Sequence, residues 1–187
     1  MTASNPTRRR LAALAAIGTS AILLLMIPLQ ASAALSASVA DLTMPGRPYS
    51  HAQQTATGNL TLTATDTGTC IVFICTNNGW HVTIQASNFA YTGPNLGSAI
   101  PAANFSITQA HPPTSPSGDP ISPQGGPRVP ASNSTGSLNT PRETLEADDN
   151  FGLGSYRQVI DVSLIVPGQS RTGSYRTTLT VTISAGP

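Results

Sequence analysis

Apolar side chains recur at every second position in several segments of this chain, a pattern typical of β-strands that are buried on one face. The alternation runs through residues 35–39, 60–64, 80–85, 105–107, 157–166 and 175–184. In the last of these segments, leucine, valine and isoleucine alternate with threonine and serine. Threonine has a high β-propensity and adds little apolar surface to the exposed face. The pattern therefore predicts an all-β protein.

The composition favours antiparallel strands joined by turns. The 187 residues include 16 glycines and 16 prolines, and only 9% of them are charged. Residues 166–169, Val-Pro-Gly-Gln, predict the turn between the last two strands. Roughly six to nine short strands of this kind predict an antiparallel β-sandwich or Greek-key arrangement. The length suits one domain.

One segment favours a helix instead of a strand. Thr140 is a suitable N-cap, Pro141 would occupy the first helical position, and Glu143 would complete a capping box. Asn150 and Gly152 would end the helix after about two turns. Residues 110–150 are rich in proline, glycine and serine, so they are predicted to form a long surface loop that carries this short helix.

The first 33 residues have the features of a secretory signal peptide. Three arginines, Arg8 to Arg10, precede an apolar run over residues 11–28, and Ala31-Ser32-Ala33 fits a cleavage site. The mature domain is therefore expected to span residues 34–187. An uncleaved membrane anchor is the alternative, because the apolar run is near the minimum length for a membrane span.

Cleavage would change the net charge of the protein. The chain contains no lysine, and loss of the three leader arginines leaves six arginines against eight acidic residues, a net charge of −2. The mature sequence has no cluster of basic residues. Because binding to phosphate backbones needs clustered cations, we expect a secreted protein that contacts neither nucleic acid nor, after cleavage, the membrane.

Sequence motifs of catalysis are absent. His51, His81 and His111 are scattered and lack metal-ligand spacing. The chain has no nucleophile elbow, zinc-protease helix or phosphate-binding loop. We expect a non-enzymatic protein without a cofactor, and a hydrolase of unrecognised type is the least favoured alternative.

One acidic cluster is a weak candidate for Ca²⁺, which takes oxygen ligands. Five oxygen-bearing side chains fall within eight residues, but their spacing does not match an EF-hand loop. Most such runs are solvated surface charge, which is the favoured interpretation. The cluster comprises Glu143, Glu146, Asp148, Asp149 and Asn150.

Cys70 and Cys75 are predicted to form a disulfide, because paired cysteines in exported proteins usually bond. In a single extended strand their Cα atoms would be about 16 Å apart, beyond the roughly 4.4–6.8 Å that a disulfide needs. The bond therefore requires residues 71–74 to fold back as a tight loop. That apolar loop either packs on the core, which is favoured, or forms an exposed prong that binds a partner.

Two segments, residues 79–89 and 152–187, resemble the WxL domain of Gram-positive surface proteins. The first contains Trp80-His81-Val82 in place of the family's Trp-x-Leu strand. The second contains Gly173-Ser174-Tyr175 and ends in a threonine-rich strand, with Val181-Thr182-Ile183 where the family has its second tryptophan. The resemblance extends in order over about residues 58–187.

The resemblance implies a secreted β-sandwich that attaches non-covalently to peptidoglycan or another cell-wall component at the cell surface. The residues that it marks as contacts with the wall are Trp80, His81, Val82, Phe89 and Tyr175. Trp80 is the only tryptophan, and a place in the core is the favoured alternative for it. The alternative function is a fimbrial-type surface subunit that assembles with itself or with other surface proteins through an exposed edge strand.

Overall fold

Antiparallel strands form most of the described part of the chain, as the alternation predicts. The structure is a computed structural model that describes residues 34–71 and 74–186, with the backbone alone between residues 69 and 76. The predicted signal peptide, residues 1–33, lies outside the described residues. Within them, no helix has the length and apolar character needed to cross a bilayer.

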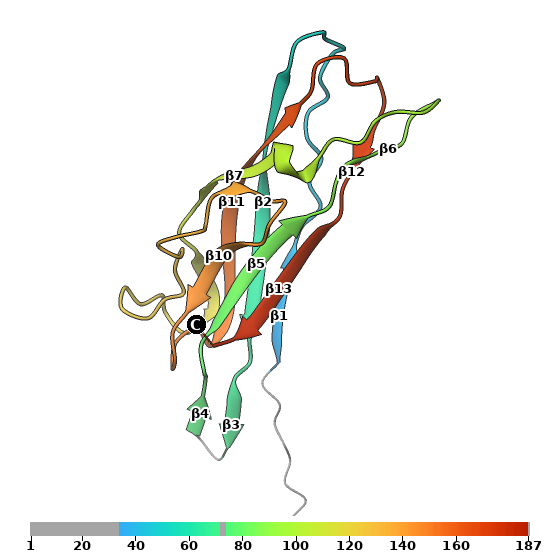
Figure 1. The fold of residues 1–187 in the computed structure, drawn as a ribbon. Helices are drawn as coiled ribbons and strands as arrows, with labels where there is room; N and C mark the ends of the chain where they lie inside the picture. Colours follow the sequence, from blue (N-terminus) through green and yellow to red (C-terminus); the bar gives the residue numbers. More distant parts are fainter. Residues whose placement is uncertain (1–33, 72–73, 187) are drawn as a thin grey trace, which may run out of the picture. The chain divides into compact units, whose positions relative to one another are not determined.

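The larger sheet has the strand order β1-β2-β11-β7-β9, and β8 also pairs with β11. Its longest pair joins β2 and β11, which are in register over 13 residues each, from Gly154 opposite Asp66 to Val166 opposite Gln54. Strands from the two halves of the chain thus lie side by side at its centre (Figure 1). The sheet contains β1 (Leu35–Val39), β2 (Gln54–Asp66), β7 (Phe105–Ala110), β8 (Thr114–Gly118), β9 (Gly136–Ser137) and β11 (Gly154–Val166).

The smaller sheet has the order β10-β5-β13 and packs on the larger one. It consists of β10 (Arg142–Ala147), β5 (Trp80–Ala86) and β13 (Leu179–Ala185). Two short antiparallel pairs complete the described fold: the hairpin of β3 (Thr69–Ile71) with β4 (Ile74–Thr76), and the long-range pair of β6 (Ala90–Tyr91) with β12 (Tyr175–Arg176). A single 3₁₀ turn, η1 (Ala102–Asn104), precedes β7.

The core lies between the two sheets and is built from the predicted alternating side chains. Leu60, Leu62 and Ile160 from the larger sheet are almost fully buried, as are Trp80 and Ile84 from the smaller one. The intervening residues face outward, so each long strand has a mainly apolar inner face and a mainly polar outer face, although in β11 Gln158 is buried and Val159 is exposed. The predicted antiparallel β-sandwich is therefore confirmed.

The predicted helix near residues 140–150 is wrong, because this segment forms strand β10, an edge strand paired with β5. A two-turn helix is only marginally stable alone, whereas the strand pairs with the backbone of β5 from Trp80 to Ile84. An irregularity in the pairing between Glu143 and Leu145 turns both Thr144 and Leu145 toward the core. The capping residues favoured a helix, but burial of the apolar side chains of Leu145 and Ala147 favours the strand.

Cys70 and Cys75 lie directly opposite each other in the β3–β4 pair. The predicted fold-back of the chain between them is confirmed by this register. Opposed residues in antiparallel strands have Cα atoms about 4.5–5.5 Å apart, within the range that a disulfide spans. The side chains of these strands lie outside the described residues, so the disulfide stays a prediction.

Candidate functional site

Three of the five residues expected to contact the wall are core residues. Trp80 and Val82 have no exposed surface, and Phe89 is 7% exposed. The Trp80 indole Nε1 donates a hydrogen bond of 3.0 Å to the Gly152 carbonyl, so its polar group is also satisfied inside the sandwich. The alternative interpretation of Trp80 as a packing residue therefore agrees with the structure, and its ring offers no face to a ligand.

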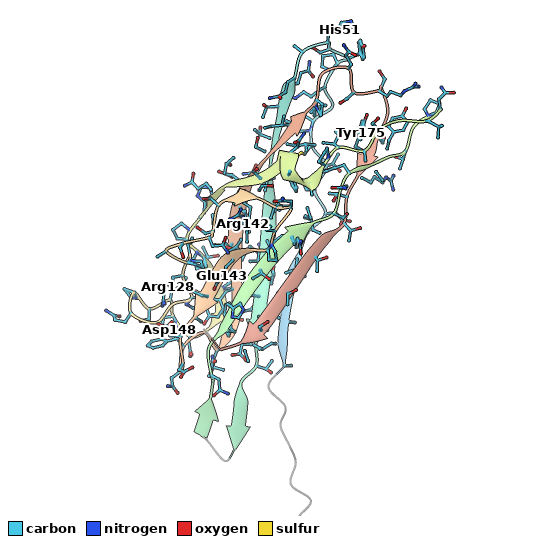
Figure 2. The ribbon with its side chains drawn as sticks, in the orientation of Figure 1. His51, Arg128, Arg142, Glu143, Asp148 and Tyr175 are labelled. Carbon is cyan, nitrogen blue, oxygen red and sulfur yellow. The ribbon has the colours of Figure 1, made fainter. Side chains whose placement is uncertain are left out.

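The other two, His81 and Tyr175, reach the surface in different places. His81 lies on the outer face of β5, where its Nδ1 is 2.8 Å from the Gly186 carbonyl oxygen. Tyr175 lies on β12 near the opposite end of the sandwich (Figure 2). The five residues are therefore not brought together in one site.

Two carboxylates of the acidic cluster, those of Glu146 and Asp148, are paired with an arginine. Arg128 forms a bidentate ion pair with Asp148, at 2.8 and 2.9 Å, and its Nε lies 2.9 Å from a Glu146 carboxylate oxygen. The hydrogen bond from Arg128 lowers the pKa of Asp148 below its ordinary value. Among the side chains that the structure describes, no group of three His, Cys, Asp or Glu residues is placed to hold a metal ion.

A concave site lies at the end of the sandwich that carries Tyr175 and His51 (Figure 2). We call this end the loop end and define it as residues 43–53, 91–101 and 167–178. Backbone hydrogen bonds join its three segments: Gln169 N–H donates to the Ser50 carbonyl at 2.8 Å, and Thr92 N–H donates to the Ser174 carbonyl at 2.8 Å. The loop end is therefore a hydrogen-bonded assembly instead of three independent loops.

Tyr91 organises the centre of the loop end. Its hydroxyl donates to the Pro94 carbonyl at 3.1 Å and is 2.9 Å from the Thr172 carbonyl, so it connects two of the loops. Its ring packs against Tyr175 with the ring centroids 5.3 Å apart. Gly93, Gly97 and Gly173 lie so close to the ring that a Cβ atom on any of them would clash with it. The glycines thus allow the loops to close around this ring.

Substitution of Gly97 by alanine should therefore displace the Tyr91 ring, because the added methyl group would overlap it. Overpacking of this kind costs about 1–3 kcal/mol in the free energy of unfolding. Gly46→Ala is the matched control, since a Cβ at Gly46 meets no atom within 4 Å and should change stability by less than about 0.5 kcal/mol. Urea unfolding of both variants measures the difference, and equal stabilities would contradict the packing described for Tyr91.

The cavity of the loop end has a volume of about 440 Å³ and opens between residues 96–100 and 167–171. Polar residues line much of it, including Ser98, Gln169, Ser170 and Arg171, and the Ser170 hydroxyl donates to the Pro167 carbonyl at 2.7 Å. Tyr175 forms part of its wall, and the Tyr175 hydroxyl donates to the Arg171 carbonyl at 3.1 Å. A concave site with an aromatic ring, amide and hydroxyl groups and one guanidinium can bind a small polar ligand.

The charges of the domain are separated along its length. The loop end contains Arg47, Arg171 and Arg176 and no aspartate or glutamate. Most acidic residues lie on the strand faces or toward the other end, where Asp66 ends β2 and Asp148 follows β10. A domain with net negative charge therefore has one end without acidic residues.

The outer face of the larger sheet is the other extended surface, and it is lined with hydroxyl groups. Five threonines point outward along β2, and serines of β1 and β11 lie opposite some of them. Their spacing of two residues places neighbours on one strand about 6.8 Å apart. The threonines are Thr55, Thr57, Thr61, Thr63 and Thr65. This face is therefore rich in hydroxyl groups, with Val159 of β11 as an exposed apolar residue on it.

No protein-family model, curated protein or solved structure matches this chain. The chemistry of the residues at the loop end is therefore the basis on which a ligand can be proposed. Sequence reasoning identified Tyr175 but missed Tyr91, Gln169 and Arg171, because the cavity forms only where loops about 70 residues apart in the sequence meet. The glycine-flanked tyrosines at 91 and 175 are the sequence signal that could have indicated it.

Proposed function

We propose that this chain is a secreted, non-enzymatic cell-surface module that binds peptidoglycan or another wall polymer non-covalently through the loop end. The cavity beside Arg171 and Tyr175 is the observation that carries the proposal, because it combines an aromatic wall with polar groups in an end free of acids. Aromatic rings with polar tips are suited to sugars, which present both apolar C–H faces and hydroxyl groups.

The scaffold supports a binding role. The loop end is fixed by the bonds of Tyr91 and Gln169 on a sandwich with a well-packed core, so little order needs to be gained on binding. The resemblance to the WxL domain points to the same class of ligand. In this proposal Tyr175 is the one residue of the expected contacts that binds the polymer, and Trp80 supports it only by stabilising the fold.

Co-sedimentation of the mature chain, residues 34–187, with isolated Gram-positive cell walls tests the proposal. We expect most of the protein in the pellet, with a reduced fraction for Tyr175→Ala. Thr182→Ala, an exposed residue of β13 remote from the cavity, is the control and should pellet like the unsubstituted chain. Protein that stays in the supernatant at physiological salt would contradict wall binding.

A second candidate function, a self-assembling or partner-assembling surface subunit, is favoured by strand β13. This strand is hydrogen-bonded in continuous register to β5 alone, although β1 lies close to its other side, and its seven residues include no charge and no proline. Natural proteins usually protect an exposed edge with such residues. Light scattering of the mature chain distinguishes the two functions: oligomers that grow with concentration favour assembly, and a monomer at high concentration contradicts it.

The disulfide is a separate proposal for the exported chain. The opposed positions of Cys70 and Cys75 predict that the oxidised protein is lighter than the reduced protein by two hydrogen atoms. Because the enclosed loop is short, the bond should stabilise the domain by only about 2 kcal/mol. Intact-mass measurement with and without reductant checks the bond, and urea unfolding of Cys70→Ser, Cys75→Ser checks the magnitude. Equal masses would contradict the disulfide.

A further inference from the structure

We infer that the loop-end cavity recognises an acidic saccharide, with Arg171 pairing to a carboxylate or phosphate group and Tyr175 contacting the adjoining sugar. This inference rests on the proposed function and specifies the chemistry of the ligand. Three observations support it: the partners of the arginines, the distribution of aspartate and glutamate residues, and the size of the cavity.

Arg171 differs from two other arginines in its surroundings. Arg128 is bound by two carboxylates, and Arg142 donates to the Ser137 carbonyl and the Asn133 side chain, at 2.9 and 2.7 Å. Arg171 lines the cavity. Among the described residues, no carboxylate lies within ion-pair distance of its guanidinium. A guanidinium is a planar donor suited to carboxylate and phosphate groups, which it binds in a bidentate manner.

The absence of acids from the loop end strengthens this preference. Screening limits the influence of exposed charges to about 8–10 Å at physiological salt, so the local charges decide which ligand approaches. Locally there are three arginines and no acid, although the mature domain as a whole is expected to be negative. An anionic ligand is therefore repelled by most of the domain and attracted at this end.

The size and lining of the cavity fit a sugar unit better than a bare ion. Its volume of about 440 Å³ falls within the range of roughly 300–1,000 Å³ typical of small-molecule sites. Ser98, Gln169 and Ser170 provide hydroxyl and amide groups for hydrogen bonds to sugar hydroxyls. The Tyr175 ring, held against Tyr91, provides a rigid surface for the sugar ring.

The test is an NMR titration of the isotopically labelled mature chain with three oligomers of similar length: an uncharged N-acetylglucosamine oligomer, a uronic-acid oligomer and a phosphate-linked polyol. Both acidic oligomers are negatively charged, one through carboxylates and the other through phosphates. Comparison between them identifies which of the two groups the cavity prefers. We expect shifts confined to residues 96–100 and 167–175. Affinity for the preferred acidic oligomer should exceed that for the neutral one by about tenfold, the effect of one charge-assisted contact.

Arg171→Gln should abolish most of this preference, so that the preferred acidic oligomer binds no more tightly than the neutral one. Arg157→Gln, on the exposed face of β11, is the matched control and should retain the preference. Arg171→Lys keeps the charge without the fork geometry and should give an intermediate affinity. Thermal melting of each variant verifies that the fold is intact.

The outcomes separate this inference from the proposed function. Equal affinity for neutral and acidic oligomers, shifts outside the loop end, or an unchanged preference in Arg171→Gln would each overturn the inference. If the chain then still co-sediments with walls, wall binding stands with a neutral ligand. If the acidic oligomer binds at the cavity but walls do not retain the chain, the cavity assignment stands and wall attachment fails.

Discussion

Replacement of Trp80 by alanine is expected to lower the free energy of unfolding by about 3–5 kcal/mol, the usual cost of deleting a fully buried aromatic side chain. Trp80 has no exposed surface and packs between the two sheets, with its ring centroid 6.0 Å from that of Tyr156. The substitution also leaves the Gly152 carbonyl without its donor. Both effects act on the core, so the loss should appear as reduced stability of the whole domain.

Urea unfolding followed by far-ultraviolet circular dichroism measures this loss, because the variant has no tryptophan fluorescence. Val159→Ala is the control, since Val159 is 39% exposed on the outer face and should change stability by less than about 1 kcal/mol. Trp80→Phe keeps an aromatic ring without the N–H group and should lie between the two. A Trp80→Ala variant as stable as the Val159→Ala variant would contradict the core role.

The same series clarifies how wall binding by Trp80 variants must be interpreted. A loss of binding in Trp80→Ala would follow from loss of the fold, because the indole faces the core and not the cavity. Trp80→Phe should therefore bind walls normally at temperatures where it is folded. Binding that fails in a folded Trp80→Phe variant would show that the tryptophan matters for recognition in a way that its burial does not explain.

The strand content of this protein could be predicted because alternation is a local property. Each long strand is buried on one face, so the identities of Leu60, Ile84 and Ile160 already specify which side faces the core. The partners of the strands could not be predicted in the same way. The pairing of β2 with β11 joins residues almost 100 positions apart, and nothing within either segment specifies that register.

Local signals also failed where tertiary contacts opposed them. Thr140, Pro141 and Glu143 satisfy the rules for a helix start, yet Leu145 and Ala147 are buried in a strand beside β5. The free energy of a two-turn helix is small compared with that of two buried apolar side chains and a completed edge. Capping residues therefore predict a helix only where a strand would not bury more of the apolar side chains that follow them.

The site was harder to predict than the fold for a physical reason. A catalytic site or metal centre needs a few residue types with fixed chemistry, whereas a saccharide site needs only ordinary polar and aromatic groups held in a concave arrangement. Arg171 and Gln169 are unremarkable in the sequence. They become a candidate site because the loop that contains them meets the loop that follows Tyr91.

Alkaline conditions should destabilise the domain through Tyr156. Burial, with smaller contributions from the negative charges of Asp119 and Asp66, raises the pKa of Tyr156 to about 12. Its ordinary value in an unfolded chain is about 10. Between these values the unfolded state loses the proton while the folded state keeps it, so the free energy of unfolding falls as the pH rises from about 10 to 12. The expected loss is about 2–3 kcal/mol.

Tyr156→Phe isolates this contribution from the other groups that titrate at high pH. The variant lacks the hydroxyl that bonds to the Asp119 and Leu153 carbonyls at 3.0 and 2.9 Å, so at pH 7 it should be about 1–2 kcal/mol less stable. Its stability should then fall less steeply than that of the unsubstituted chain, and the two curves should cross between about pH 10.5 and 12. Urea unfolding at several pH values from 7 to 12 measures both curves. Parallel curves would mean that Tyr156 ionises equally in both states, which its burial between the sheets does not allow.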